Sequence, residues 1–599
     1  MKYKYDSSDN LVDLIEDSTD KFKDRPLFGT PDEKGEYSWI TYREFKRLVD
    51  DLRSALNRKG IQKDDAIGVI IGNSIVFAQV AFASYGLCAR FVPMYEQELM
   101  HTWKYIINDA EIKVLFVRNK EIYEQIMQYK DELLCLEKVF IIEGDGENSL
   151  KALLQKDVLP FVKPLRPLPD DIAALIYTSG TTARPKGVLL SHGNFSTNFK
   201  TGGALFPNEL GPESRSLSIL PWAHSFGQTA ELYNFIYIGG SIGFIRNVQT
   251  IGADIKKVKP TFLIAVPRIF NKIYNNLLAK IDEKNGIAKK LFDMGIESAQ
   301  KKREQEAKKE KPSFITNLKY FIGEKVVFKK IRQEFGGKLE GALTASATMN
   351  SKISYFFTDI KIPVYDCYGL TETSPAVTLN SPTENRVKSV GKPIKDVRVV
   401  IDKSGGQDND EGEIIVFGPN LMQGYHKKET ETKKVMTKDG GFRTGDCGRL
   451  DKDGFLYITG RFKEQYKLSN GKYVFPNAIE EEIKLLPLVE NAVVYGEQRD
   501  FNICLIVPDY QVIKSFAQKH NLPQDKKAFV EDKRTKTLFH DMITEFLKNK
   551  FTNYEIPKEF IIIEESFTLE NLMLTQTMKL KRTKVFEKYM STIETCYSK

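Results

Sequence analysis

Residues Tyr177 to Val188 read YTSGTTARPKGV, directly after the apolar run Ile172 to Ile176. A buried strand that ends in Ser, Thr and Gly leaves backbone N–H groups free to face an anion such as a polyphosphate. Pro185 stands where the ordinary phosphate-binding loop has a second glycine before its lysine, so this is a different loop. A polar surface loop with one cation is the alternative. The residues that suit a phosphate site are Thr178, Ser179, Gly180, Thr181, Thr182, Lys186 and Gly187.

Size and composition set broad limits on the class of protein. At 599 residues and 41% hydrophobic content, the chain can build a large core and more than one domain. The net charge of +8 is too dilute over this length to predict a nucleic-acid partner. Six cysteines are scattered without a CxxC pair, so neither a zinc site nor a disulfide framework is indicated and a reducing cytoplasm fits. The N-terminus is acidic where a secretory signal needs an apolar run, so we expect no export.

The segment Ala66 to Ala89 contains no charged residue and is long enough to span a bilayer. Glycines and polar residues divide it, however. It therefore fits better a buried strand (Ile67 to Ile71), a turn at Gly72-Asn73-Ser74 and an apolar helix from Ile75.

Helical and β-rich segments alternate along the first part of the chain, which predicts a mostly parallel sheet covered by helices. Phe45 to Leu56 is an amphipathic helix, and strands are expected at 114–117, 139–142, 217–220, 241–245 and 262–266. Ile269 to Ile331 then has helical spacing. Within it, Lys301 to Lys311 has six cations against three anions. A solvated helix face is the favoured interpretation of that run, and a membrane-facing or partner-facing arm is the alternative.

A second motif follows the strand Val364 to Cys367 and reads YGLTET from Tyr368 to Thr373. Tyr368 offers a flat face for a purine, Gly369 permits close approach, and Glu372 provides the hard oxygen that a nucleotide-bound magnesium requires. Together with the loop at 177–188, this turn resembles the signatures of the adenylate-forming superfamily, which includes acyl-CoA synthetases, luciferases and peptide-synthetase adenylation domains. The helical segment resembles that of the long-chain fatty acyl-CoA synthetases.

Three further strings resemble that superfamily. The resemblance implies that Asp446, in RTGD, accepts the ribose hydroxyls with Arg461 of GRFK beside it, and that Lys463 and Lys467 flank the nucleotide. Glu464 occupies the position of the hinge between domains, where Asp is commoner. In LTQTMKLKR (574–582), the catalytic lysine is placed at Lys579, with Lys581 as the alternative.

Other positions depart from the pattern or carry weaker signals. The turn Ala345-Ser346-Ala347-Thr348 falls where the family has a Gly-rich turn against adenine, and the Gly pair is missing. A PxxHxxG turn at 221–227 borders the acyl pocket in the family, which makes Trp222 and His224 candidates for lining it. Three more residues complete the implied nucleotide and adenine contacts: Asp366, Thr371 and Gly369.

The resemblance implies an α/β fold with a large N-terminal adenylation domain of layered α/β subdomains (1–463, with a helical segment at about 275–335). A small mixed α+β lid (464–599) is expected to follow. The implied reaction joins a long-chain fatty acid to coenzyme A by way of acyl-AMP, at the expense of ATP. Lys579, Glu372, Thr181 and Lys186 are then the catalytic residues, and Thr181 and Glu372 are those nearest Mg2+.

Several alternatives stay open at this point. A fatty acyl-AMP ligase would not accept coenzyme A, a ligase for a medium-chain or aryl acid would differ in substrate, and a nucleotide-binding protein without activity would need damaged signatures. We expect a cytoplasmic protein whose partners are the fatty acid and coenzyme A. Peripheral association with the inner face of a membrane and a homodimer are left open.

Overall fold

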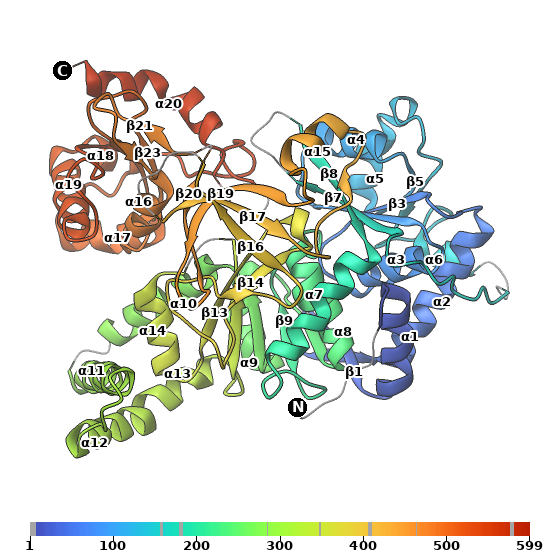
Figure 1. The fold of residues 1–599 in the computed structure, drawn as a ribbon, viewed down its shortest axis with the longest axis horizontal. Coiled ribbons are helices and arrows are strands. Elements are labelled where there is room, and N and C mark those ends of the chain that lie inside the picture. The colour runs from blue at the N-terminus through green and yellow to red at the C-terminus, as the bar shows by residue number, and fades with distance from the viewer. Residues whose placement is uncertain are drawn as a thin grey trace. The chain divides into compact units, whose positions relative to one another are not determined.

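The computed structural model describes residues 8–155, 160–178, 184–283, 286–346, 349–404, 410–462, 464–575 and 580–598. Its backbone divides into two compact units, which are described separately below (Figure 1). Unit 1 comprises Met1–Val400, Ile415–Arg443 and Asp451–Leu456, and unit 2 comprises Ile401–Ile414, Thr444–Leu450 and Tyr457–Lys599. The two units are defined by how compactly the backbone packs, which does not test where a hinge lies. The hinge at Glu464 and the domain boundary before it therefore stay predictions.

A seven-stranded sheet in unit 1 carries the predicted phosphate loop, in the order β18-β8-β7-β4-β3-β5-β6. Its strands from β7 to β6 pair in parallel, whereas β7 and β8 are antiparallel and enclose the loop. The parallel strands are short apolar runs because helices cover them. The bounds are β3 Ala66–Ile70, β4 Arg90–Met94, β5 Ile112–Val117, β6 Lys138–Ile141, β7 Ile172–Thr178, β8 Lys186–Ser191 and β18 Gly424–Tyr425. The predicted mostly parallel sheet is confirmed.

Two smaller sheets lie wholly within unit 1, in the orders β2-β1-β10-β9 and β11-β12-β13-β14-β15. In the second, β11, β12 and β13 are parallel, and β13 ends in the predicted Tyr-Gly turn. The bounds in the first sheet are β1 Pro26–Pro31, β2 Tyr37–Thr41, β9 Arg215–Ser218 and β10 Ser241–Phe244. Those in the second are β11 Phe262–Ala265, β12 Gly341–Thr344, β13 Val364–Gly369, β14 Ala376–Leu379 and β15 Lys392–Pro393.

The helices of unit 1 lie at or near the predicted positions. The charge-free segment that begins at Ala66 forms β3 and then α3, whose N-terminus is capped by the hydroxyl of Ser74. No described helix has both the length and the apolar character that a bilayer span needs. The α-helices before residue 267 are α1 Leu11–Phe22, α2 Tyr42–Arg58, α3 Ile75–Tyr85, α4 Met100–Asp109, α5 Lys120–Met127, α6 Leu150–Gln155, α7 His192–Leu205, α8 Asn234–Ile238 and α9 Ile251–Val258.

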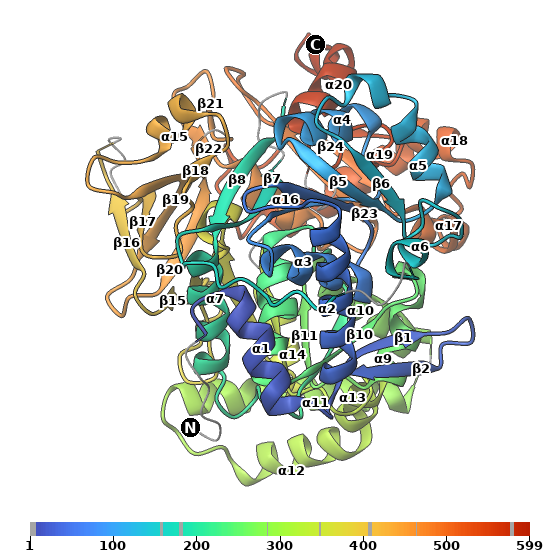
Figure 2. The same ribbon diagram turned by 90° about the vertical axis from the view of Figure 1, so that its right-hand side faces the viewer.

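The predicted helical segment is confirmed as a run of helices between β11 and β12. It comprises α10 Pro267–Glu283, α11 Ile287–Ala307, α12 Phe314–Gly323, the π-helix η4 Glu324–Phe328 and α13 Lys329–Glu334. In both views α11 and α12 lie at the outer edge of unit 1 (Figures 1 and 2). The remaining helices of unit 1 are α14 Ser351–Asp359, α15 Glu429–Val435, the π-helix η2 Gly227–Tyr233 and the short 3-10 turns η1 Lys130–Glu132, η3 Val248–Thr250 and η5 Thr371–Thr373.

Unit 2 is built on a mixed sheet in which β24 pairs antiparallel with β23 and parallel with β25. Alternate residues of β24 enter two different apolar clusters, so both faces of this strand are buried. The strands are β21 Tyr466–Lys467, β22 Tyr473–Val474, β23 Val489–Tyr495, β24 Ile503–Pro508 and β25 Glu559–Ile562. The helices are α16 Pro476–Ile483, α17 Tyr510–Lys519, α18 Lys526–Glu531, α19 Lys533–Leu547 and α20 Arg582–Tyr597. The expected compact α+β segment is confirmed.

A further sheet has the order β16-β17-β19-β20, and its residues are divided between the two units. A tight turn joins β19 and β20, where Gly454 has a φ of +84° and donates its N–H to the carbonyl of Asp451. Glycine fits this turn because it adopts a positive φ without steric cost. The bounds are β16 Arg398–Asp402, β17 Gly412–Phe417, β19 Phe442–Leu450 and β20 Leu456–Arg461.

Candidate active site

The ends of β7 and β8 form the base of the predicted phosphate loop. Thr178 closes β7 directly opposite Lys186, which opens β8. Gly187 lies against the ring of Tyr177, where an added Cβ would come within 2.9 Å of the ring. The Tyr177 hydroxyl donates a hydrogen bond of 2.7 Å to the carboxylate of Asp109. Four predicted loop residues lie outside the described residues: Ser179, Gly180, Thr181 and Thr182.

The second motif leaves β13 through a turn that requires glycine at its first position. An added Cβ on Gly369 would lie 1.8 Å from the carbonyl oxygen of Pro375, so no larger residue fits. That same oxygen accepts the N–H of Leu370 at 3.1 Å. Tyr368 is half-buried beside it, and the hydroxyl of Thr371 lies 3.2 Å from that of Ser225. The turn therefore projects η5, and with it Glu372, from the end of the strand.

Glu372 and Lys186 are brought to the same place by a third residue, Tyr425. The Tyr425 hydroxyl donates to Glu372 Oε1 at 2.8 Å, and Lys186 Nζ lies 4.8 Å from the centroid of the same ring. The backbone also contributes, because the N–H of Met422 donates to the carbonyl of Glu372 at 2.9 Å. Burial and the nearby carboxylate both raise the pKa of Tyr425, so it stays a hydroxyl donor at neutral pH. The two predicted motifs thus share one site in unit 1.

The strand that supplies Tyr425 is fixed by pairing with the strand that supplies Lys186. Tyr425 lies opposite Val188, and the N–H of His426 donates to the carbonyl of Gly187 at 2.8 Å. The imidazole Nε2 of His426 lies 2.9 Å from the carbonyl of Asp109. Burial lowers the pKa of His426, so the neutral ring donates to this carbonyl. Sequence reasoning missed Tyr425 and His426, because neither belongs to a motif with recognisable spacing.

The predicted adenine turn lies where β12 and β13 run side by side. Ser346 has a φ of +80°, and the carboxylate of Asp366 accepts the backbone N–H of Met349 at 3.1 Å. This bond ties the chain after the turn to β13. Asp366 is only 4% exposed, and burial raises its pKa to about 7. Ala347 lies outside the described residues, and contacts of Ser346 and Asp366 with a nucleotide stay predictions.

The two residues predicted to line an acyl pocket differ in their surroundings. Trp222 has no exposed surface and packs against three aromatic rings, those of Phe28, Phe77 and Phe244. Its indole N–H donates to the buried Glu231 at 2.8 Å. His224 is half-buried, and its Nδ1 accepts the N–H of Phe226 at 3.1 Å. These contacts give Trp222 a place in the aromatic core, and a role of either residue in binding an acyl chain stays a prediction.

Glu231 is a buried carboxyl group that sequence reasoning missed. Besides the indole, two serine hydroxyls donate to it at 2.5 Å each, those of Ser216 and Ser218. Burial raises the pKa of Glu231. Its donors come from β9 and from the turn after it, so the carboxyl fixes the PxxHxxG turn to the sheet.

In unit 2, the residues predicted to hold a ribose lie together. Arg461 Nε is 2.9 Å from Asp446 Oδ1, and the N–H of Asp446 donates to the hydroxyl of Thr444 at 3.1 Å. Gly445 between them has a φ of +72°. Lys467 is exposed, with its Nζ 4.6 Å from the centroid of the Tyr473 ring. Lys463 lies outside the described residues.

The predicted hinge residue is connected to the final motif by a half-buried arginine. Arg582 Nε lies 3.8 Å from Glu464, its Nη1 donates to Glu480 at 2.7 Å, and it also contacts the side-chain oxygen of Asn477. Arg582 is the last residue of the final motif and the first of α20, so this network fixes the point where the motif joins the helix. Lys579 lies outside the described residues, and the N–H of Lys581 donates to the carbonyl of Met573 at 2.8 Å.

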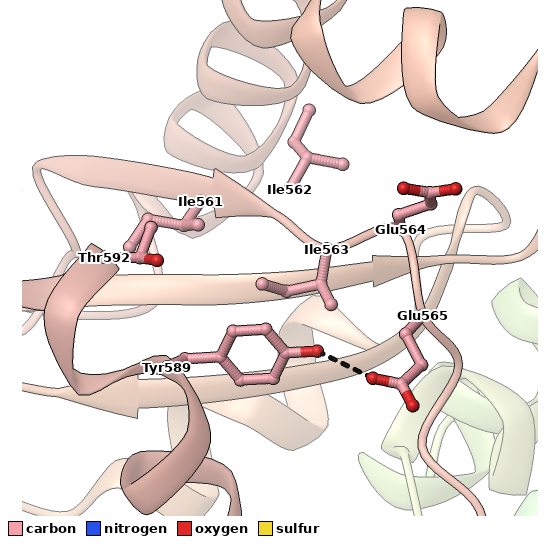
Figure 3. Close-up of a pocket in the computed structure, with 7 residues that line it drawn as sticks. All are labelled: Ile561, Ile562, Ile563, Glu564, Glu565, Tyr589 and Thr592. Atoms are coloured by element: carbon pink, nitrogen blue, oxygen red, sulfur yellow. Dashed lines mark hydrogen bonds between the residues drawn. The ribbon is translucent and has the colours of Figure 1, made fainter.

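A pocket of about 330 Å³ in unit 2 contains none of the predicted site residues (Figure 3). The close-up shows the ring of Tyr589 beneath Ile563, with its hydroxyl bonded to Glu565. The wall is formed by Ile561, Ile562, Ile563, Glu564, Glu565, Tyr589 and Thr592. None of these lining residues is basic, so the pocket is unsuited to binding a triphosphate. The candidate active site is therefore assigned from the motif residues.

Comparison with known families identifies the chain. The AMP-binding enzyme family matches residues 15–426, and the C-terminal domain of AMP-binding enzymes matches residues 463–599. The chain belongs to the AMP-binding enzyme family. Its relatives include the long-chain-fatty-acid–CoA ligase FadD15 of Mycobacterium bovis, 29% identical over 94% of this chain and 93% of that protein. Fatty acyl-CoA synthetase A of Dictyostelium discoideum is 30% identical over 94% of this chain and 86% of its own length.

Solved structures of other proteins share the fold. The adenylation domain of a carboxylate reductase from Mycobacterium chelonae has a TM-score of 0.79 at 21% identity, covering 98% of this chain and 91% of that chain. An anthranilate CoA ligase in complex with anthranoyl-AMP has a TM-score of 0.74 at 18% identity, covering 98% of this chain and 97% of that chain. At such identities the likeness establishes the architecture, and substrate choice has to be argued from the site.

Proposed function

We propose that this protein is an ATP-dependent long-chain fatty acid–CoA ligase. The observation that carries the proposal is the meeting of Glu372, Tyr425 and Lys186 at the base of the β7–β8 loop, since it joins two motifs far apart in sequence. The relative from Mycobacterium bovis, which is named a long-chain-fatty-acid–CoA ligase and aligns with 94% of this chain, supports the choice of acid. ATP and coenzyme A are then co-substrates.

The first half-reaction joins the fatty acid to AMP. A carboxylate oxygen attacks the α-phosphorus, the bond to the β-phosphate oxygen breaks, and pyrophosphate leaves. Lys186 at the start of β8 is placed to neutralise phosphate charge at the loop. Lys579 would neutralise charge between the carboxylate and the α-phosphate. No side-chain nucleophile is needed, because alignment and electrostatic stabilisation supply most of the barrier reduction.

The chemistry of Glu372 fits a magnesium ion bound with the triphosphate. Magnesium in such sites takes one or two carboxylates and completes its shell with phosphate oxygens and water. Among the described residues, no group of three or more His, Cys, Asp or Glu side chains is arranged as a metal cage, which agrees with a site completed by the nucleotide. The hydroxyl bond from Tyr425 orients the carboxylate. Glu372 and the hydroxyl of Thr181 would hold the ion, whose charge would stabilise the departing pyrophosphate.

The second half-reaction forms the thioester. The thiol of coenzyme A gives up its proton to solvent and its sulfur forms a bond to the acyl carbon of acyl-AMP. The bond from that carbon to the phosphate oxygen breaks, and AMP leaves with the bonding electrons. We propose that the C-terminal segment turns about Glu464 between the two half-reactions and withdraws Lys579. The ion pair between Arg582 and Glu480 supports this, because it makes α20 and α16 move as one body.

Assays with purified protein test the reaction and its rivals. Acid-dependent pyrophosphate release, followed with a series of acids from short to very long, should be greatest with long chains. Thioester formation on addition of coenzyme A should follow. Release of pyrophosphate without thioester would instead indicate an acyl-AMP ligase, and preference for an aryl or medium-chain acid would reassign the substrate. No acid-dependent release with any acid would refute the ligase assignment.

The proposal also covers where the protein is located in the cell. We propose a cytoplasmic enzyme that associates peripherally with the inner face of a membrane, where long-chain acids and their thioesters partition. Cell fractionation tests this, since release from the membrane fraction by salt distinguishes peripheral binding from free solution. A homodimer stays open, and the mass of the protein in solution decides it.

A further inference from the structure

Helix α12 exposes its large apolar side chains. Phe314 is 81% exposed, Ile315 64%, Leu318 47% and Phe321 52%. Their spacing places them along one side of the helix. A surface helix of a globular protein normally turns such a stripe inward, and monomeric proteins rarely expose a contiguous apolar patch of this kind. We call these four residues the α12 face.

The α12 face is exposed because α12 packs through its small residues. Thr316 and Gly323 are buried, and an added Cβ on Gly323 would lie 2.7 Å from the Cα of Gly295 in α11. Glycine on both helices allows this close approach, and it leaves the bulky side of α12 pointing outward. Helix α12 also lies at the outer edge of unit 1 in both views (Figures 1 and 2). The exposure is therefore a result of how unit 1 packs.

Lysines outnumber acidic residues in α12 and the segments next to it. Residues 311–330 contain five lysines and one acidic residue, Glu324. Glu324 is bound by Arg332 at 2.5 Å and by Lys361 at 3.4 Å, so its charge is already balanced. The five lysines are all exposed, and none forms an ion pair with a residue in the described ranges: Lys311, Lys319, Lys325, Lys329 and Lys330.

We propose that the α12 face docks on the surface of an anionic lipid bilayer, with its apolar side chains among the acyl chains and its lysines at the headgroups. Apolar residues flanked by lysines on an exposed helix suit a membrane interface. A second copy of the chain is disfavoured as the occupant, because a symmetric contact would set the lysines of one copy against those of the other. This proposal depends on the proposed function in one respect: the long-chain acid that the ligase would use is dissolved in such a bilayer.

Binding to vesicles tests the docking directly. The full-length protein is mixed with phosphatidylcholine vesicles, with and without phosphatidylglycerol, and the bound fraction is measured by flotation. We expect strong binding only with the anionic lipid, and weaker binding as salt is raised. Equal binding to both vesicles, or to neither, overturns the proposal.

Two double variants separate the apolar and the charged contributions. Lys319→Gln with Lys325→Gln should weaken binding roughly 30-fold, at about fivefold for each lysine lost near the surface. Leu318→Ser with Phe321→Ser should weaken it more than tenfold, since both side chains leave the acyl region. Because these positions are exposed, both variants should keep the melting temperature of the wild type.

The matched control makes the same change in charge elsewhere. Lys120→Gln with Lys151→Gln alters two lysines that are 80% and 63% exposed and far from α12 in sequence, and it should bind vesicles like the wild type. Equal losses in the control and in the α12 variants would mean that net charge alone drives binding, which overturns the proposal.

Ligase activity and oligomeric state, both measured without lipid, decide between the remaining explanations. Activity on a soluble medium-chain acid without lipid should be equal in the wild type and the variants. If the wild type has no ligase activity yet binds vesicles through α12, the proposed function fails and the docking stands. A change from dimer to monomer in the Leu318→Ser, Phe321→Ser protein without lipid would assign the face to a second copy. Retention of anionic vesicle binding in that protein would show that the α12 face is not the surface that binds the bilayer. Either result refutes the docking.

Discussion

Replacing Tyr425 with Phe removes one hydroxyl and keeps the ring beside which Lys186 lies. The lost contact is the 2.8 Å bond to Glu372 Oε1. A hydrogen bond to a charged group contributes about 1.5–3 kcal/mol, but Glu372 is half-buried, so water replaces part of it. We therefore expect transition-state stabilisation to fall by about 1–2 kcal/mol, or roughly 5- to 30-fold in kcat/KM.

The assay is acid-dependent pyrophosphate release, measured at several magnesium concentrations. If Tyr425 orients the carboxylate for the ion, Tyr425→Phe should raise the magnesium concentration that gives half-maximal rate. Tyr425→Leu also removes the ring beside Lys186, a contact worth about 0.5–1 kcal/mol, and should therefore be slower still. A merely structural role for Tyr425 would lower the melting temperature without this change in magnesium dependence.

A double-mutant cycle with Glu372→Ala, which leaves no side-chain oxygen to accept the Tyr425 hydroxyl, isolates the contact itself. The two single substitutions should be non-additive by about 1–2 kcal/mol, because each removes the same bond. Full additivity, or an unchanged magnesium dependence in Tyr425→Phe, would refute the role given to Tyr425.

Three other predictions concern the rest of the site. Asp366 has a pKa of about 7 when folded and 3.8 in the ordinary case, so wild-type stability should fall as pH rises through this window. Asp366→Asn does not ionise, so its free energy of unfolding in urea should rise by about 2–3 kcal/mol relative to that of the wild type between about pH 5 and pH 8. The same dependence of stability on pH in the two proteins would contradict the role of a buried acid at this position. Gly369→Ala should abolish adenylation and lower the melting temperature, because its Cβ would meet the Pro375 carbonyl at 1.8 Å; a fully active Ala variant would disprove this packing. Lys579→Ala should suppress acyl-AMP formation while Lys581→Ala retains it, and the reverse result would exchange the two assignments.

Local sequence signals predicted the elements that carry the site. The apolar run before Tyr177 is β7, and the run before Tyr368 is β13, because each is a short buried strand bounded by turn residues. The long helical segment between β11 and β12 was equally readable, since helical periodicity is a property of neighbouring residues. The glycine required at position 369 was also predicted, although its cause in the structure is the carbonyl of Pro375 rather than a ligand.

Other features depended on contacts between distant segments. Nothing near Tyr425 in the sequence shows that it pairs with β8, and only this pairing brings its hydroxyl to Glu372. The sequence indicated the charged run Lys301 to Lys311 as a possible contact surface, whereas the exposed apolar face lies on the next helix, α12. Which side of α12 faces outward was decided by the contact between Gly295 and Gly323.

The sequence by itself determined the family, the strand ends that carry its motifs and the residue types that suit a magnesium nucleotide. These depend on short stretches whose chemistry and backbone preferences are local. Only the tertiary structure decided which distant side chains orient Glu372, why the pKa of Asp366 is raised and which face of α12 meets solvent. Those properties arise from burial and from pairing between distant segments, and no local pattern encodes either.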